Sequence, residues 1–503
     1  MRAASTFLLL VGCAPAAADL VVVNGGDAAV LDPQLAQTLP EARLAAALHA
    51  GLTRYHPQSL EPLPDLAVSW TRDAAARRWS FLLRPDARWS DGTPLTGADV
   101  VASWDRLVAP TTGAPYRAWL DGAHWTLRRG DDGGEVLEVV LPDSRPAFAA
   151  QCATWPLAVV HARLREAPPG ALPDPFVSSG PFRLVRRRIG DRVRVERNPH
   201  SWRAAEVAVG TLDLLAVSSR FTALNLFLAG EAAWLPQAPR LAVPALLERR
   251  PDAFQPTPRF GTYFLRLRCD DPLLRDQRLR MALARALDRD RIAADLGGTR
   301  PPSDVLVPPL LPGAPRLASP QAFDPAAARL LLAAVRADLE REGRAAELDR
   351  LELLVPSTDL DRDLAHVLRD QWLRHLGLEV RIVLLEARSA HALERDGEFR
   401  ISRSSWIGDY PDPTTFLELF RTDHPGNRTG WSDVGFDALL DRAATAGNAT
   451  ERAALLAEAE ARLLAAAPVV PLLGEALEDV ADPRLRGFHR NLLGYVDWAS
   501  LSW

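Results

Sequence analysis

The sequence predicts a mixed α/β protein with more than one domain, and three observations support this. The chain has 503 residues, which exceeds what one hydrophobic core usually serves. Two β-rich regions lie far apart, at residues 20–23 and 182–197. Residues 351–385 read as strand, helix and strand, which is the pattern of a parallel βαβ unit.

Short elements follow one another in the N-terminal part of the chain. Residues 41–50 predict a helix closed by Gly51, and residues 79–83 predict a strand. Thr96 and Asp99 have the spacing of a capping box, in which a hydroxyl and a carboxylate three residues on satisfy free backbone amides. They therefore predict the start of a further helix.

The middle of the chain changes its periodicity. Residues 182–185 and 192–197 predict a hairpin, because the second run alternates apolar and charged side chains. In residues 276–296 the leucines recur at helical spacing instead.

The clearest pattern is the βαβ unit. A buried strand is predicted at 351–355, an amphipathic helix at 361–376 and a second strand at 378–385. Gly377 stands where a helix C-cap is expected.

Composition excludes several classes of function. All 59 residues counted as lysine or arginine are arginine, so no Walker A loop, Schiff-base lysine or Ser-x-x-Lys nucleophile is possible. The formal charge of −5 and the lack of a basic stripe do not fit a nucleic-acid-binding protein. No G-x-S-x-G, H-E-x-x-H or Cys-His catalytic motif occurs, so we expect neither an enzyme nor a cofactor.

Residues 1–18 read as an export segment, with a basic start, an apolar run and an A-x-A cleavage site at 16–18. The stretch Leu10-Val11-Gly12-Cys13 resembles a bacterial lipobox, which predicts lipidation of Cys13. The alternative is an ordinary signal peptide cut after Ala18. Either form places the mature chain in the periplasm or at the cell surface, tethered by lipid or free. Export together with two sheet systems favours a two-lobed receptor with a cleft.

Two further cysteines, Cys152 and Cys269, leave two possibilities open. Export permits a disulfide between them, whereas their wide separation is equally compatible with buried free thiols.

Five sequence blocks occur in the order found in one known family. The chain resembles the peptide-binding (cluster C, family 5) solute receptors of ABC importers. In chain order the blocks are Leu31-Asp32-Pro33; Trp89-Ser90-Asp91-Gly92-Thr93-Pro94-Leu95-Thr96 with Asp99-Val100 and Ser103-Trp104; Ser179-Gly180-Pro181-Phe182 through Glu196-Arg197-Asn198-Pro199; Asp276, Arg278, Arg280, Ala282, Ala286, Asp288 and Arg289; and Trp406-Ile407-Gly408-Asp409-Tyr410-Pro411-Asp412-Pro413.

The resemblance implies a two-lobed, type II periplasmic-binding-protein fold with an inserted extra domain and a two-crossover hinge near residues 262 and 480. The implied parts are lobe I at 19–50, 165–262 and 480–503, the extra domain at 51–164 and lobe II at 263–479. The implied partners are a peptide ligand and the permease and ATPase of an importer, with the receptor acting as a monomer.

The resemblance also implies a set of ligand-binding residues. Asp409 matches the carboxylate that pairs with a peptide ammonium, although it also fits a turn residue before Tyr410 and Pro411. Trp406 would pack on the ligand or in the core. Arg403 would meet a ligand carboxylate or remain solvated, and Tyr116 would line the cleft.

Two backbone segments, Gln37–Leu39 and Ser405–Ile407, are implied to flank the ligand as strands. A receptor that reads backbone groups tolerates many side chains, which suits a broad peptide class. Ile407 replaces a cysteine that some relatives bridge to the other wall of the cleft. The same architecture also serves dipeptides, cell-wall peptides, nickel chelates, haem and sugars, or a signalling receptor, so the solute stays open.

Overall fold

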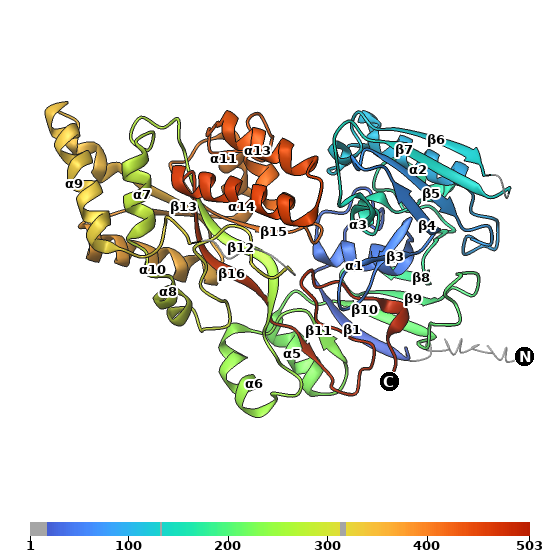
Figure 1. Ribbon diagram of the computed structural model, residues 1–503. Helices are drawn as coiled ribbons and strands as arrows, with labels where there is room; N and C mark the ends of the chain where they lie inside the picture. Colours follow the sequence, from blue (N-terminus) through green and yellow to red (C-terminus); the bar gives the residue numbers. More distant parts are fainter. Residues whose placement is uncertain (1–17, 131–132, 312–317) are drawn as a thin grey trace, which may run out of the picture.

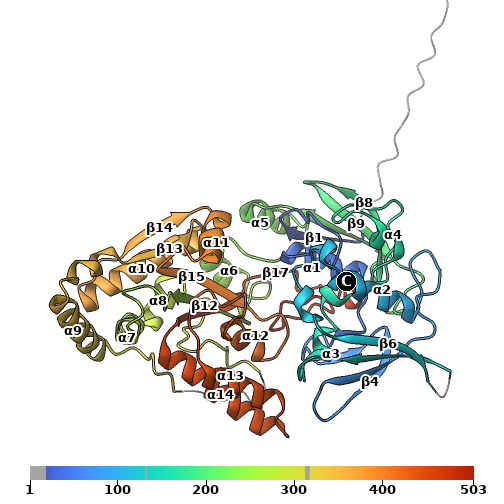
Figure 2. The ribbon, with the colours of Figure 1, turned by 90° about the horizontal axis from the view of Figure 1, so that it is seen from above.

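The computed structural model describes residues 18–130, 133–311 and 318–503. The predicted export segment, including Cys13, lies outside these residues except for Ala18. Figure 1 shows two lobes side by side, with the blue and cyan segments in one and the yellow and orange segments in the other. The view from above separates the same two lobes (Figure 2).

The first lobe contains a four-stranded sheet of order β1-β10-β9-β8, in which β1 runs parallel to β10. The predicted hairpin is confirmed as the antiparallel pair β8–β9. Helix α1 packs beside this sheet, and its Leu44 and Leu48 share an apolar core with Phe182. The elements are β1 (Leu20–Gly25), α1 (Leu39–Leu48), β8 (Phe182–Arg188), β9 (Arg192–Arg197) and β10 (Thr211–Ala216).

Helix α1 begins and ends two residues earlier than the sequence predicts, and Gly51 is not its cap. A Cβ at Gly51 would lie 2.3 Å from the carbonyl oxygen of Cys152, so glycine is required there for close packing of two segments. The helix instead begins with a capping box in which Thr38 and Glu41 exchange hydrogen bonds.

A second four-stranded sheet, of order β4-β5-β7-β6, has its own apolar core with α2. The capping box of Thr96 and Asp99 is confirmed at the start of α2. The elements are β4 (Ala67–Arg72), β5 (Arg78–Leu83), α2 (Gly97–Val108), β6 (His124–Arg129) and β7 (Glu135–Val140), preceded by the small ladder of β2 (Thr53–Tyr55) and β3 (Pro62–Pro64).

The second lobe is built on a five-stranded sheet of order β14-β13-β15-β12-β16. The predicted βαβ unit is confirmed, since β13 and β14 are parallel and Gly377 ends α10 at a φ of 64°. The elements are β12 (Thr257–Leu267), β13 (Glu352–Pro356), α10 (Asp359–Leu376), β14 (Arg381–Leu385), β15 (Ile401–Ile407) and β16 (Val469–Leu477).

The helical segment at 276–296 is two helices rather than one. Asp288 divides it, because its carboxylate accepts a hydrogen bond from the Arg291 backbone amide and starts a new helix. The two are α7 (Gln277–Arg285) and α8 (Arg289–Asp295).

The remaining helices cover the sheets and carry the connections between them. They are α3 (Phe148–Gln151), α4 (Ala162–Glu166), α5 (Arg220–Leu228), α6 (Val243–Arg249), α9 (Pro325–Arg341), α11 (Ala387–Asp396), α12 (Thr414–Leu417), α13 (Val434–Ala444) and α14 (Ala449–Ala466). Short 3-10 helices lie at Pro110–Thr112, Arg117–Trp119, Trp155–Leu157, Arg240–Ala242, Ala345–Arg350, Glu418–Phe420 and Trp498–Ser500.

Two adjacent strands lead from the five-stranded sheet toward the first lobe. β12 and β16 are antiparallel, with Thr257 opposite Leu477. Beyond them, β17 (Val480–Ala481) pairs with β11 (Trp234–Leu235). The predicted boundaries of the lobes and of the extra domain stay a prediction.

The two cysteines of the described chain are both free thiols, so the disulfide alternative does not apply. Cys152 is buried and Cys269 is half-buried, as expected for small apolar side chains. In the same described residues, none of the helices combines the length and apolar composition needed to cross a membrane.

Candidate ligand-binding cavity

A cavity of about 1180 Å³ lies where the two lobes face each other. Its lining includes α1, the loops around Tyr55 and Tyr116, the end of β15, the strand β16 and the loop at Tyr495. Pockets for drug-sized ligands usually measure about 300–1,000 Å³. The volume therefore suits an extended ligand of several residues.

The lobes contact each other around this cavity. Nη1 of Arg240 lies 2.6 Å from the carboxylate of Asp363 on α10. The Ser144 hydroxyl donates a hydrogen bond to the carbonyl of Ala444. The two lobes are therefore in direct contact beside the cavity that both of them line.

Asp409 lines the cavity just beyond the end of β15. A Cβ at Gly408 would meet the Phe260 ring at 2.4 Å, so only glycine lets the chain turn against the core here. The Asp409 amide then donates to Thr415 Oγ1 at 3.1 Å, which holds the turn in place.

The carboxylate of Asp409 has no cation within 4 Å among the described residues. Burial alone raises its pKa to about 7. The charge of Asp409 in turn contributes to the raised pKa values of the Tyr55 and Tyr116 phenols, which burial mainly causes. This carboxylate is thus an uncompensated acceptor that a ligand cation can neutralise.

Arg403 also lines the cavity, but it already has a partner. Its Nε lies 2.6 Å from Asp361 Oδ1, and its guanidinium lies 4.3 Å from the ring centroid of Tyr263. Asp361 is only 3% exposed, at the start of α10. A ligand carboxylate would have to compete with Asp361 for Arg403.

Alternation along β15 separates the residues that the sequence groups together. Arg403 and Ile407 line the cavity and lie on one face of the strand, whereas Trp406 is out of phase with them. Trp406 packs against the core around Phe260 and does not line the cavity; its Nε1 is 3.4 Å from Thr415 Oγ1. Ser405 is in phase with Arg403 and Ile407 but is not among the cavity-lining residues.

The edge of β15 is open beside the cavity. β12 pairs with β15 from Ile401 to Ile407, but β13 pairs with it only at Ile401 and Ser402. Among the described residues no second strand pairs with 403–407. An extended ligand can therefore add to this edge through backbone hydrogen bonds.

The segment Gln37–Leu39 lines the cavity but is not the predicted strand. Leu39 is the first residue of α1, and the Gln37 and Thr38 amides donate to Glu41 Oε2 at 2.9 and 3.0 Å. The backbone amides expected for a ligand are used by the helix cap. Tyr116 lines the cavity as expected and packs edge-to-face on Trp155.

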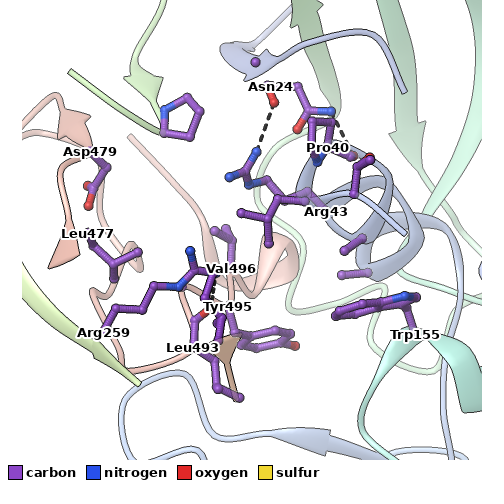
Figure 3. Close-up of a pocket in the computed structure, with 18 of the residues that line it drawn as sticks. Asn24, Pro40, Arg43, Trp155, Arg259, Leu477, Asp479, Leu493, Tyr495 and Val496 are labelled. Atoms are coloured by element: carbon purple, nitrogen blue, oxygen red, sulfur yellow. Dashed lines mark hydrogen bonds between the residues drawn. The ribbon is translucent and has the colours of Figure 1, made fainter. Parts of the chain in front are cut away.

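Two arginines of the cavity stand in no sequence motif. Arg43 comes from α1 and Arg259 from β12, and Figure 3 shows both side chains reaching into the same part of the cavity. Arginine is frequent along the whole chain, so no sequence signal distinguishes either of them from a surface arginine. Among the described residues no cluster of His, Cys, Asp and Glu is arranged to hold a metal ion.

The chain is similar to several proteins over nearly its whole length. It is 27% identical to the periplasmic murein peptide-binding protein MppA of Escherichia coli, covering 92% of this chain and 89% of MppA. It is 28% identical to the probable deoxycholate-binding periplasmic protein YgiS of E. coli, with the same coverage of 92% and 89%. It is also 28% identical to the periplasmic oligopeptide-binding protein OppA of Salmonella typhimurium, covering 90% and 86%.

Solved structures agree with the fold. The E. coli murein tripeptide binding protein MppA matches with a TM-score of 0.82 at 26% identity, covering 96% of this chain and 97% of MppA. A structure of MppA in an unliganded open form matches less well, with a TM-score of 0.73 at the same identity and coverage of 96% and 95%.

The family model described as bacterial extracellular solute-binding proteins, family 5 Middle, matches residues 61–428. This segment covers well over half of the chain and contains both the second sheet and most of the cavity-lining part of the second lobe. The chain belongs to the family 5 bacterial extracellular solute-binding proteins.

Proposed function

We propose that this protein captures peptides with a free amino terminus outside the cytoplasm and delivers them to an ABC-type importer. The observation that carries this proposal is the unpaired carboxylate of Asp409 beside the open edge of β15. The similarity to MppA and OppA supports it, because both are named as peptide-binding proteins. The role is binding and delivery rather than catalysis, and the receptor acts as a monomer with a permease and an ATPase.

The cavity favours an ammonium group at Asp409 for an electrostatic reason. An ionised carboxylate without a partner is costly in a closed cavity, and a ligand cation removes that cost. The peptide backbone would extend along residues 403–407 of β15, where hydrogen-bonding groups are free of a second strand. Side chains would occupy the rest of the cavity, where water adapts to residues of different size.

Binding is coupled to closure in this proposal. A ligand that contacts both lobes stabilises the closed form and shifts the population toward it. Small-angle scattering with and without a peptide pool should then show a smaller radius of gyration with peptide. An unchanged radius despite measured binding would contradict a hinged receptor.

A second candidate ligand is an amphipathic carboxylate of the deoxycholate type. The similarity to YgiS and the two cavity arginines without acidic partners favour it. Such a ligand has no amine, so it leaves Asp409 unneutralised. Metal chelates, sugars and haem, or a signalling role, have no specific support in the cavity.

The proposed location is the periplasm or the outer face of a membrane. Lipidation at Cys13 predicts that the protein stays with membranes after a salt wash, because several acyl chains anchor stably. Cys13→Ala should release it or block maturation. Recovery of a soluble mature chain beginning at Asp19 would show instead that the signal is cut after Ala18.

The test of the proposed function compares one peptide in free and N-acetylated forms by calorimetric titration. Acetylation removes the charge that Asp409 would neutralise and should weaken binding strongly. Mass spectrometry of the solute that copurifies gives an independent identification. If acetylated and free peptides bind equally well, Asp409 is a turn residue and the solute is not recognised by its amine.

A further inference from the structure

Two guanidinium groups face the cavity, one from the first lobe and one from a strand that connects the two lobes. Arg43 lies on α1 of the first lobe, and Arg259 lies on β12, which belongs to the sheet of the second lobe. Arg43 Nη1 donates to the carbonyl oxygen of Asn24 at 2.9 Å, and Arg259 Nη2 donates to that of Leu493 at 3.3 Å. Both hydrogen bonds are drawn in Figure 3. They use one nitrogen of each group and leave the others free for a ligand.

Neither arginine has a carboxylate within 4 Å in the described part of the chain. Arg259 is only 8% exposed, and its Nε has no hydrogen-bond partner there. Its cross-strand neighbour Glu475 raises the pKa of Arg259 against the effect of burial, but lies in ion-pair range of Arg300 at 3.8 Å. A buried donor without an acceptor is costly, which points to a group that is supplied with the ligand.

Four other arginines of the cavity are compensated by protein carboxylates. Each of them lies within 4 Å of an aspartate or glutamate. The pairs are Arg203 with Asp497, Arg300 with Glu478, Arg403 with Asp361, and Arg490 with Asp479. Arg54 also lines the cavity without such a partner among the described residues, so Arg43 and Arg259 are two of three part-buried arginines that the cavity leaves positive.

The two charges also act on each other. Burial and the charge of Arg259 together lower the pKa of Arg43 to about 9, against the opposite effect of Asp479. Both groups stay protonated at neutral pH, so two like charges share one low-dielectric space. An anion between them would relieve this repulsion.

We infer that Arg43 and Arg259 form a subsite for a carboxylate of the ligand. This inference rests on the proposed function and assigns the anionic end of the peptide, as Asp409 is assigned its ammonium. Asp409 is not among the charges that shift the pKa values of the two arginines. A zwitterionic ligand matches both poles, because guanidinium groups bind carboxylates through paired hydrogen bonds.

The carboxylate can come from two sources. A peptide supplies its terminal carboxylate, and a steroid acid of the deoxycholate type supplies a single carboxylate on an apolar body. The two sources differ at Asp409, because only the peptide brings an amine. Either ligand would place its carboxylate against the guanidinium groups of Arg43 and Arg259.

The first measurement uses the wild-type protein and needs no substitution. Trialanine and its C-terminal amide are titrated in a calorimeter at neutral pH. We expect the amide to bind on the order of a hundredfold more weakly, because it leaves two buried cations without an anion. Deoxycholate is titrated in parallel, with its uncharged methyl ester as the matched control.

The second measurement repeats these titrations with Arg43→Gln, Arg259→Gln and the double variant. The double variant should lose on the order of a hundredfold in affinity for the carboxylate ligand and bind acid and amide equally. Arg259→Lys keeps the charge and should restore part of the difference. Arg249→Gln removes an exposed arginine of α6 and should change nothing.

The outcomes separate this inference from the proposed function. If deoxycholate but no peptide binds the wild type, the proposed peptide function is wrong. The subsite is then tested by the binding of deoxycholate and its methyl ester to the arginine variants. If the double variant binds the carboxylate ligands as tightly as the wild type, the subsite is overturned even where peptide binding stands. Failure of the wild type to bind any carboxylate ligand overturns both. Thermal unfolding of each variant checks that it is folded.

Discussion

Asp361 and Asp409 line the same cavity from the same lobe, yet their electrostatic states are opposite. Asp361 lies within 2.6 Å of the Arg403 guanidinium and also accepts a hydrogen bond from the Thr358 hydroxyl at 2.7 Å. Asp409 has no cation within 4 Å among the described residues, and burial raises its pKa to about 7. The carboxylate of Asp361 is paired within the protein, whereas that of Asp409 remains available to a ligand.

The comparison teaches that lining a cavity is not the same as being available in it. A buried ion pair contributes little net stability but is costly to break, so Asp361 holds Arg403 in place. An unpaired carboxylate destabilises the empty closed form and gains energy when a cation arrives. The two aspartates should therefore respond in opposite ways to the same substitution.

The largest expected effect is on ligand affinity. Asp409→Asn keeps the shape of the side chain and removes its charge, so a buried peptide ammonium loses its counter-ion. Such a loss costs about 3–5 kcal/mol, or roughly a hundredfold to several thousandfold in affinity. Calorimetric titration of free and N-acetylated peptide into both proteins gives a double-mutant cycle. The two losses should not add, since both delete the same interaction.

The second prediction concerns stability. Asp361→Asn leaves Arg403 buried without its carboxylate and should lower the free energy of unfolding by about 3 kcal/mol. Chemical denaturation measures this loss, with Asp409→Asn as the matched control that should not show it. The selectivity of Asp361→Asn for free over acetylated peptide should persist. Loss of that selectivity would mean that Asp361 takes part in amine recognition.

The local patterns of the sequence were sufficient for much of the fold. The βαβ unit around α10, the capping box at Thr96 and the hairpin β8–β9 depend on neighbouring residues, so their signals lie in short segments. The division at Asp288 was missed because leucine spacing continues across it while the backbone starts a new helix. Periodicity records which side chains are buried and is less sensitive to such breaks.

The site was less predictable because its electrostatics depend on tertiary contacts. The motif around Asp409 placed that residue at the cavity, but no motif reports that Arg403 meets Asp361 from another element. Arg43 and Arg259 are far apart in the sequence, and only the tertiary structure brings their charges close enough to act on each other. Gln37 was expected to offer its amide to a ligand, but Glu41 takes it.

The third prediction is a pH dependence that only Asp409 should cause. With a pKa of about 7, ligand-free Asp409 keeps its proton at pH 6, and an ammonium can bind only after that proton leaves. Affinity for a free peptide should rise about tenfold per pH unit up to about 7 and then level off. Titrations at pH 6 in buffers of different ionisation enthalpy should detect the released proton.

The stability of the ligand-free protein should change with pH in the direction opposite to that of peptide affinity. The folded state holds the Asp409 proton between about pH 4 and pH 7, where the unfolded state has released it, so this contribution falls as pH rises through that window. Burial also raises the pKa of Asp65 in the same cavity to about 6. The free energy of unfolding is therefore measured against pH for the wild type and for Asp409→Asn, and the difference between the two curves gives the contribution of Asp409. Equal curves would show that Asp409 does not contribute to the pH dependence of stability.

The smallest expected effect is at the contact between Arg240, which lines the cavity, and Asp363, which does not; this contact joins the two lobes. Their side chains are 36% and 50% exposed, so solvent screens the pair and its contribution to closure is about 0–1 kcal/mol. Arg240→Gln should therefore weaken peptide binding by less than about fivefold, and the loss should shrink at high salt. Asp363→Asn should have the same effect, with no further loss in the double variant, because both remove one contact. A loss as large as that of Asp409→Asn would mean that surface contacts rather than the buried carboxylate hold the closed form together, and the contrast between paired and unpaired groups would then not explain ligand binding.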